Sequence, residues 1–296
     1  MNRAWNIVWK IALGLAIPGI VLVLIGLKLG WPQSVVWGSN GPRVIDTHDV
    51  QVSENNLQPF DKISVDAAVI DVRIARGDHY GLTLNAVTTY LDTTWANQDG
   101  TLTIHQTRRL NVMGWYDQTA TAIITVPDGT VLTSIDVTTA ASTITCDVPA
   151  ATTTLISSAG DATLTATAQK ATVRTGTGDA VVDAAGGTVS ASSSTGDTKV
   201  TGKFDSVTAS SDTGNVVVSG SAPQVDATSS TGDVTITLDA TWATTTYLLH
   251  TSMGDVRLFG PGAPSSHSRS GTATGTVQLN LTASTSIGDI RVTLGG

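Results

Sequence analysis

The sequence predicts an all-β protein: a β-solenoid of about 18-residue coils, preceded by a β-rich cap region, with one N-terminal transmembrane helix. Three observations lead to this fold class. A Gly-Asp dipeptide, once Gly-Asn, recurs at a constant interval in the second half of the chain. Strand-like alternation fills the region before it, and an uncharged apolar run lies near the amino terminus. A fixed period of roughly 20 residues without helix-forming stretches is typical of a solenoid.

Residues 11–27 form the apolar run, IALGLAIPGIVLVLIGL. As a helix this run would be roughly 26 Å long, close to the ~30 Å hydrocarbon core of a bilayer. Tryptophans, which favour the membrane interface, flank it on both sides: Trp5, Trp9, Trp31 and Trp37. More positive charge precedes the run than follows it, so the positive-inside rule places the amino tail in the cytoplasm and residues from 31 onward outside the cell.

Two alternatives to a membrane anchor are a cleaved signal peptide and a buried helix of the folded domain. The chain after the run reads LKLGWPQSVVW and lacks a small-x-small cleavage motif, which disfavours cleavage. Pro18 inside the run is compatible with a span. We therefore expect residues 1–30 to be a short cytoplasmic tail and transmembrane signal anchor. Residues 31–59, with several Pro and Gly, are expected to be a linker.

Residues 60–134 contain stretches with strand alternation, such as ISVDAAVIDVRI and GTLTIHQT. Turn sequences interrupt them, including Asp99-Gly100 and Pro127-Asp128-Gly129. This range is expected to be the N-terminal β region of the domain, with strands that lead into the coils.

Residues 135–296 are expected to form the solenoid repeats. The recurring glycines are Gly160, Gly178, Gly196, Gly214 and Gly232. Small or apolar residues precede each glycine by seven, five and three positions, as in Val207, Ala209 and Ser211, and apolar or small ones follow it four and six positions later. This spacing predicts two short strands per coil, each with one inward and one outward face.

The same register extends in both directions. One period further back lies Ser142, around which Ile135, Val137, Cys146 and Val148 occupy the inward positions. Going forward, Gly254 and Gly288 follow at longer intervals, which indicates one coil each with insertions. Each coil is expected to stack on the previous one in the chain at about 4.8 Å. The glycine would supply the positive φ of a tight corner, and the following Asp or Asn would hydrogen-bond local backbone.

The order of these motifs resembles that of a known family. An apolar amino-terminal run, an ISVDAAVIDVRI opening, GTLTI, IITVPDGT with a following IDV, and stacked S-x-T-G-D units are similar to the bacterial putative-adhesin family of uncharacterised function, which includes LiaG-like proteins of cell-envelope stress operons. The resemblance covers about residues 60–296. It implies a β-solenoid at the outer surface of a bacterial membrane, and it carries over no catalytic residues.

Composition limits the chemistry. Lys and Arg number 16 against 24 Asp and Glu, a net charge of −8, which argues against nucleic acid as a partner. The single cysteine, Cys146, excludes an intramolecular disulfide and is expected to be a core residue with a raised pKa. The histidines show no paired ligand spacing. We therefore predict no catalytic residues and no cofactor.

The column of residues that follows the glycines leaves one alternative open. Asp161, Asp179, Asp197 and Asp233, with Asn215 among them, would stack about 4.8 Å apart. Turn formation is the favoured interpretation, and a ladder of calcium sites is the alternative. Calcium-binding nonapeptide solenoids carry their glycine-aspartate motif twice per coil, whereas this chain carries it once. A polysaccharide-cleaving β-helix is disfavoured because the repeats from 160 to 232 have no insertions.

The sequence thus predicts a non-catalytic, membrane-anchored extracellular solenoid that acts in adhesion or cell-wall contact. The alternative is an accessory or regulatory component of a cell-envelope stress response system. The expected partners are the membrane, through the N-terminal helix, and either a cell-wall or surface glycan or an envelope-stress membrane protein.

Overall fold

The computed structural model describes residues 35–38, 41–44, 48–88, 91–108, 119–265 and 267–295. Within these ranges, no helix is long and apolar enough to cross a membrane. The apolar run at 11–27 lies outside the described residues, so the transmembrane helix stays a prediction.

Strands make up most of the described chain. Before the repeats they are β1 (Val35–Gly38), β2 (Gly41–Val44), β3 (His48–Glu54), β4 (Lys62–Ala67), β5 (Asp71–Gly77), β6 (Gly81–Thr88), β7 (Leu91–Gln98), β8 (Thr101–Arg108) and β9 (Thr119–Pro127). In the repeats they are β10 (Leu132–Ala141), β11 (Ile144–Cys146), β12 (Ala150–Ala159), β13 (Ala162–Leu164), β14 (Ala168–Thr177), β15 (Ala180–Thr195), β16 (Thr198–Lys203), β17 (Ser206–Thr213), β18 (Val216–Ser221), β19 (Gln224–Thr231) and β20 (Val234–Leu238). The last part holds the short 3-10 helix η1 (Trp242–Thr244), then β21 (Thr245–Met253), β22 (Val256–Phe259), β23 (Ser270–Gly271), β24 (Leu279–Ile287) and β25 (Ile290–Leu294).

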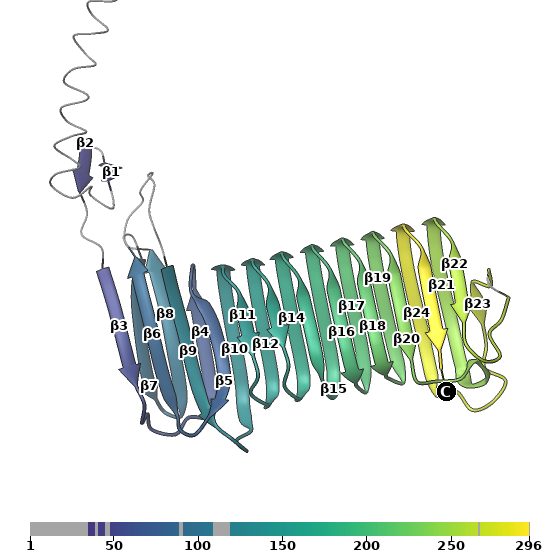
Figure 1. Ribbon diagram of the computed structural model, residues 1–296, viewed down its shortest axis with the longest axis horizontal. Coiled ribbons are helices and arrows are strands. Elements are labelled where there is room, and N and C mark those ends of the chain that lie inside the picture. The colour runs from purple at the N-terminus through teal and green to yellow at the C-terminus, as the bar shows by residue number, and fades with distance from the viewer. Residues whose placement is uncertain are drawn as a thin grey trace, which may run out of the picture.

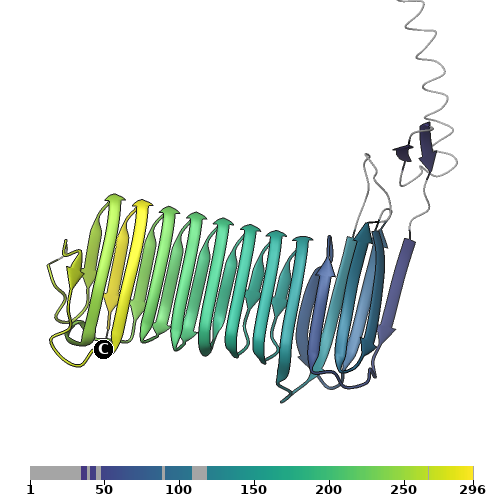
Figure 2. The same ribbon diagram turned by 180° about the vertical axis from the view of Figure 1, so that it is seen from behind.

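The strands after β2 form a long rod with two facing sheets (Figures 1 and 2). Sheet 1 holds the strands that lead into each Gly-Asp corner and runs in the spatial order β7, β8, β4, β10, β12, β14, β15, β17, β19, β24, β21, β23. Sheet 2 holds the strands that leave the corner and runs in the order β3, β6, β9, β5, β11, β13, β15, β16, β18, β20, β25, β22. Strand β15 bends from sheet 2 into sheet 1 and belongs to both.

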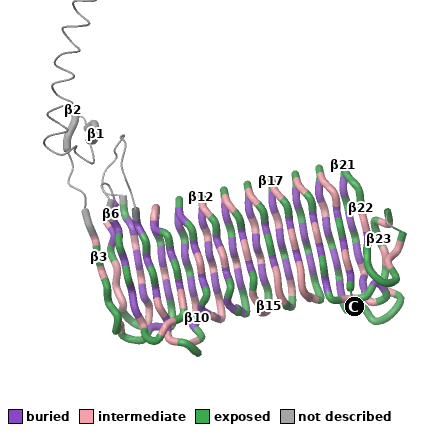
Figure 3. Tube along the Cα trace, in the orientation of Figure 1, coloured by how far each residue is buried: buried purple, intermediate pink, exposed green. Residues whose placement is uncertain are grey.

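From β10 to β20 the repeats stack in parallel, each shifted by one sequence period from its neighbour. Val189 pairs with Val207 in sheet 1, and Val200 pairs with Val218 in sheet 2. Because the shift equals the period, chemically similar residues form columns along the rod. Buried and exposed positions alternate along each strand, as Figure 3 shows. The predicted β-solenoid and its register are confirmed.

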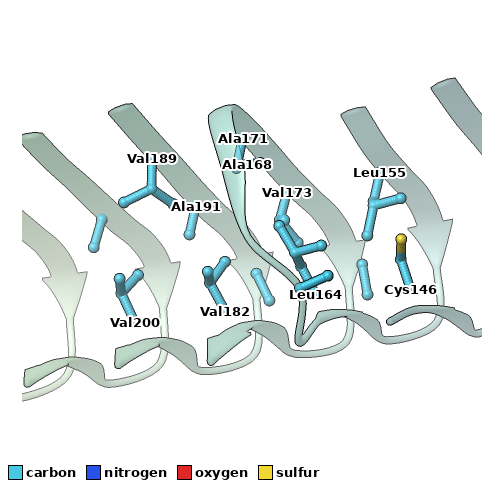
Figure 4. Packing of buried hydrophobic residues seen from close by; sticks show 14 of the residues in the cluster. Cys146, Leu155, Leu164, Ala168, Ala171, Val173, Val182, Val189, Ala191 and Val200 are labelled. Carbon is cyan, nitrogen blue, oxygen red and sulfur yellow. The ribbon is translucent and has the colours of Figure 1, made fainter. Parts of the chain in front are cut away.

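The core is a thin layer between the two sheets. Figure 4 shows Leu155, Val173 and Val189 of sheet 1 facing Leu164 and Val182 of sheet 2. All five side chains are fully buried. Burying a Val or Leu side chain stabilises a fold by about 1.5–3 kcal/mol, so each coil contributes a few such increments through contacts with its neighbours.

The order of the coils differs at the C-terminal end from the expectation that each coil stacks on the previous one. The last coil in the chain, β24 and β25, lies between the coil of β19 and β20 and the coil of β21 and β22 (Figure 1). The two insertions explain this arrangement. The longer connection around η1 carries the chain past one layer, and residues 260–278 bring it back to fill that layer.

The N-terminal end shows a similar displacement. Strands β4 and β5 form a coil that lies between β10 and β11 on one side and β8 and β9 on the other. The region 60–134 was expected to lead into the coils, but residues 62–77 already form one. Strand β7 pairs antiparallel with β8 at this end of sheet 1, and β6 pairs antiparallel with β9 and with the outermost strand of sheet 2, β3.

The expected linker at 31–59 requires a correction. Strand β3 pairs antiparallel with β6 from His48↔Thr88 to Glu54↔Leu82. Val50 and Val52 alternate with polar residues and pack against the core, so this segment has the pattern of a half-buried strand. Strands β1 and β2, also inside the range, pair antiparallel with each other.

Candidate functional site

The Gly-Asp corners, which join sheet 1 to sheet 2, hold the residues that the sequence singled out. Gly196 and Gly214 adopt φ of 139° and 144°. A Cβ atom on Gly214 would lie 2.2 Å from the carbonyl oxygen of Gly196, and one on Gly196 would lie 2.3 Å from that of Gly178. Glycine is therefore required by close backbone approach between coils as well as by φ.

The acidic residues of the corner bond the neighbouring coil, which corrects the expectation of local bonding. Asp179 Oδ1 accepts the backbone N–H of Asp197 at 2.8 Å, and Asp197 Oδ1 accepts that of Asn215 at 2.7 Å. Equivalent bonds join Asp161 to Asp179, Asn215 to Asp233, Asp233 to Asp289, and Asp289 to Asp255. A ladder of side-chain to backbone hydrogen bonds thus runs along the corner.

The sequence missed three members of this ladder. Asp289 and Asp255 follow the glycines of the last two units, and their order in the ladder repeats the displaced order of the coils. Asp71 accepts the backbone N–H of Thr143 at 2.9 Å, although no glycine precedes it. The sequence feature that could have identified Asp71 as a corner residue is its position directly before the inward Val72, which matches that of Asp161 before Ala162.

A second ladder runs just inside the corner. In six coils, a buried hydroxyl three positions before the corner residue donates to the corner carbonyl of the adjacent coil, whereas Thr175 donates to the carbonyl of Gly178 in its own coil. Ser193 Oγ donates to the carbonyl of Gly178 at 2.8 Å, and Ser211 Oγ to that of Gly196 at 2.8 Å. The same bond is made by Ser157, Ser229, Thr285 and Thr251. These inward hydroxyls and the corner carbonyls thus satisfy each other's hydrogen-bonding capacity inside the rod.

The ladder accounts for the acidic column without a metal. Each of the four predicted aspartates uses one carboxylate oxygen to accept a backbone N–H. Within the described ranges, no group of three or more His, Cys, Asp or Glu side chains is arranged to hold a metal ion. The calcium alternative stays a prediction to be tested by experiment.

Cys146 lies inside the core, fully buried on β11. Burial raises the pKa of its thiol to about 12, because a thiolate there would lose its hydration. The thiol lies 3.7 Å from the carbonyl oxygen of Val148. The position and the direction of the pKa shift agree with the sequence prediction, and a thiol with this pKa is a poor nucleophile.

The outer faces of the two sheets carry regular columns of polar side chains. On sheet 1, one outward column runs through Thr154, Thr172, Ser190 and Thr208. On sheet 2, another runs through Thr201, Ser219, Thr237 and Thr293. The hydroxyl oxygens of Thr201 and Ser219 lie 3.1 Å apart. Both faces thus present hydroxyl groups at the spacing of the strands, about 4.8 Å.

Two shallow grooves run along the side of the rod opposite the corners. Their volumes are about 510 and 700 Å³, and Ala185, Gly186 and Asp205 line both. Lys203 and Asp239 are the other charged residues that line the smaller one. Small residues such as Ala185 and Gly186 make up about half of the lining of each groove.

The comparison with protein families decides the assignment. The Toastrack DUF4097 family matches residues 60–293. The chain belongs to this family. The assignment agrees with the resemblance of the sequence to adhesin-like proteins and with the parallel stack of coils. The range that matches the Toastrack family also covers the displaced coil at 62–77 and all but the last residue of the one at 279–294.

Several solved structures are similar to this Toastrack chain at low sequence identity. One is a putative adhesin from Bacteroides fragilis NCTC 9343, with 14% identity and a TM-score of 0.36, covering 83% of this chain and 97% of that one. Another is a putative cell adhesion protein from Clostridium sporogenes ATCC 15579, with 8% identity, a TM-score of 0.26 and coverage of 84% and 99%. A third is a putative lipid binding protein from Parabacteroides distasonis ATCC 8503, with 11% identity, a TM-score of 0.34 and coverage of 83% and 96%. A comparison with curated proteins gave no match.

Proposed function

We propose that this Toastrack chain is a non-catalytic, membrane-anchored surface protein whose rod contacts polymers of the cell envelope or of a neighbouring surface. The observation that carries the proposal is the pair of outer faces, on each of which a column of hydroxyl groups runs over four successive layers. A rigid face with a regular repeat of donors and acceptors is suited to a ligand that is itself a repeating polymer, such as a glycan. The anchor in this proposal is the apolar run at residues 11–27.

The rod architecture supports a role as a contact surface. Each coil touches mainly its neighbours, so the faces are long relative to the core. A glycan that lies along the columns would make many weak hydrogen bonds, each worth about 0.5–1.5 kcal/mol net, and the sum would depend on the number of coils in contact. Such binding needs no catalytic group, no cofactor and no metal.

Co-sedimentation of the full chain in detergent micelles with purified peptidoglycan, with and without teichoic acid, tests the proposal. We expect the chain to sediment with at least one of these polymers. A Thr172→Glu, Thr208→Glu double variant alters the face of sheet 1. A Thr235→Glu, Thr237→Glu double variant makes the corresponding change on the face of sheet 2, so each variant is the control for the other. Loss of binding in one variant would identify the binding face. If, for every polymer tested, micelles that carry the chain sediment no more than empty micelles do, the proposal is refuted.

The alternative role, an accessory component of an envelope-stress system, is supported by the resemblance to LiaG-like proteins. It predicts that deletion changes the output of an envelope-stress reporter while the purified chain binds no envelope polymer. If the purified chain does bind a polymer, a variant that has lost this binding can be expressed in the deletion strain. Full restoration of the reporter output by that variant would favour this alternative over the contact role.

A further inference from the structure

The C-terminal end of the rod differs from its middle in the character of its outward residues. At the position just before the corner glycine, the middle coils carry threonine, as in Thr213 and Thr231, whereas the last two layers carry Ile287 and Met253. Met253 is 64% exposed and Ile287 is 49% exposed, and the two are paired neighbours. Two large apolar side chains therefore replace hydroxyls at this end of one column.

Two other outward columns change in the same way in the final layer. The sheet 2 column of Thr237 and Thr293 ends in Phe259, which is 44% exposed. The sheet 1 column that contains Thr282 continues to Leu248, which is 59% exposed and is followed by Ser270 of β23. We call Leu248, Met253, Phe259 and Ile287 the end patch. Leu248 lies on the outer face of sheet 1 and Phe259 on that of sheet 2, so these exposed apolar residues surround the end of the rod, and exposed apolar surface of this kind is typical of a contact site.

The backbone of the same layer has an open edge. Strand β23 pairs with β21, so sheet 1 is covered there, and within the described part of the chain β22 pairs only with β25 (Figure 1). The backbone N–H of Ile290 donates to the carbonyl of Asp255, so Asp255 faces β25. By strand alternation, the N–H and C=O groups of Val256 and Leu258 then point away from the rod. An open edge of this kind can pair with another strand.

We propose that the C-terminal end of the rod docks a second copy of this chain, with the two β22 strands paired antiparallel across a twofold axis. Val256 and Leu258 both direct backbone groups outward, and we place the axis at Leu258, where Leu258 of each copy can exchange both hydrogen bonds with Leu258 of the other. In this register Arg257 of one copy lies directly opposite Phe259 of the other, on the same outward face. The symmetry generates this contact twice.

The Arg257–Phe259 pairing supports a copy of the same chain as the occupant. A guanidinium group over an aromatic ring is a favourable contact, and here each strand supplies one partner of each pair. Arg257 is held in place by Asp255 at 3.0 Å and by Asp289 at 3.5 Å, and its side chain remains 43% exposed. An alternative register with the axis at Arg257 would bring the two Arg257 side chains directly opposite each other, and such a pair of like charges is unfavourable.

The pairing adds a specific partner, a second copy of the chain, to the proposed contact role. Only the placement of the two rods on membranes rests on the proposed function. If the rod is anchored through its amino end, the end patch lies at the far end, about 50 Å away along layers spaced ~4.8 Å apart. Rods from two opposing membranes would then meet tip to tip. A single contact of this size is expected to be weak, and many tethered copies would act together. The pairing itself is measurable whether or not the rod binds a polymer.

Sedimentation velocity of the full chain in detergent micelles tests the proposal. We expect a concentration-dependent dimer that the Met253→Lys, Phe259→Lys double variant abolishes, since both residues are exposed. Ile123→Lys is the matched control, because Ile123 is an exposed apolar residue on β9 at the other end of the rod, and it should leave the dimer intact. A dimer that persists in the double variant, or an open-ended series of larger species, would refute the twofold pairing.

Disulfide formation tests the register. Cys146 is buried, so an engineered thiol is the reactive one. A mixture of Arg257→Cys and Phe259→Cys chains should cross-link severalfold faster than either chain alone. Equal rates in the mixture and in the two separate samples, or no cross-link at all in the mixture, would overturn the proposed register and the contact.

Discussion

The corner ladder makes a sharp prediction at Asp197, whose Oδ1 accepts the backbone N–H of Asn215 at 2.7 Å. Replacement by Asn keeps an oxygen acceptor in place, and the chain already uses Asn215 in this way toward Asp233 at 3.0 Å. Replacement by Ala removes the acceptor and leaves an N–H at the corner without its partner. The two variants therefore separate the hydrogen bond from the charge.

The magnitudes follow from the spacing of the coils. Asp179 and Asp197 lie one layer apart, and two carboxylates about 4.8 Å apart repel by roughly 0.9 kcal/mol in bulk water, less in salt. Asp197→Asn relieves this repulsion and exchanges a charged acceptor for a neutral one, so the free energy of unfolding should change by less than about 0.5 kcal/mol. Asp197→Ala loses a hydrogen bond worth about 1–2 kcal/mol and regains part of it from reduced repulsion. Its net loss should be about 1 kcal/mol.

Thermal unfolding of the full chain, followed by circular dichroism, measures both effects. At about 2–4 °C per kcal/mol, Asp197→Ala should lower the Tm by about 2–4 °C and Asp197→Asn by less than about 2 °C. Millimolar calcium should shift the wild-type Tm by less than about 3 °C relative to chelator. Equal losses in the two variants would refute the ladder. A rise with calcium well beyond that limit, abolished by Asp197→Asn, would assign the column to metal binding, because a ligand of the folded state raises stability with its concentration.

Three further predictions concern the core and the corner. Val218 is 1% exposed, so Val218→Asp should lower the free energy of unfolding by about 4 kcal/mol or more at neutral pH. Burial raises the pKa of the new carboxyl, so this loss should shrink as the pH drops toward 4. Ser219 points outward, and Ser219→Asp should cost less than about 1 kcal/mol. Equal urea midpoints for these two variants would contradict the strand register. Gly214→Ala should cost several kcal/mol in the same unfolding assay, because its Cβ would lie 2.2 Å from a backbone oxygen at positive φ, and a change below about 1 kcal/mol would exclude the close approach. The thiol of Cys146, with a pKa of about 12, should react with a thiol reagent at pH 8 only after unfolding, and rapid reaction of the folded chain would contradict its burial.

The repeat register was accessible from the sequence because equivalent positions recur with a fixed period and lie on the same face of the coil. Glycine at the corner, Val200 and Val218 facing inward, and a buried Cys146 all followed from that period. The bonding of Asp197 to the next coil did not, because sequence spacing cannot distinguish a local turn bond from a bond between layers.

The displaced coils were also beyond the sequence pattern. The longer interval between Gly232 and Gly254 fits a coil that stacks directly on the coil of Gly232 and contains a bulge. It fits equally well a coil that lies one layer further along and leaves the layer between them for a later segment. Pairing of Asp233 with Asp289 decides between these arrangements, and it depends on tertiary contacts. The coil that contains Asp71 lacks the corner glycine, so the period gave no reason to include it.

The central claim is that this rod is displayed outside the cell while it stays attached to the membrane through residues 11–27. Protease added to intact protoplasts that carry the full chain tests this claim most directly. We predict that antibody against the rod detects its loss from the membrane fraction, while a cytoplasmic control protein stays intact. A rod that is fully protected until the protoplasts are lysed, or that is released quantitatively into the medium before protease is added, would contradict the account.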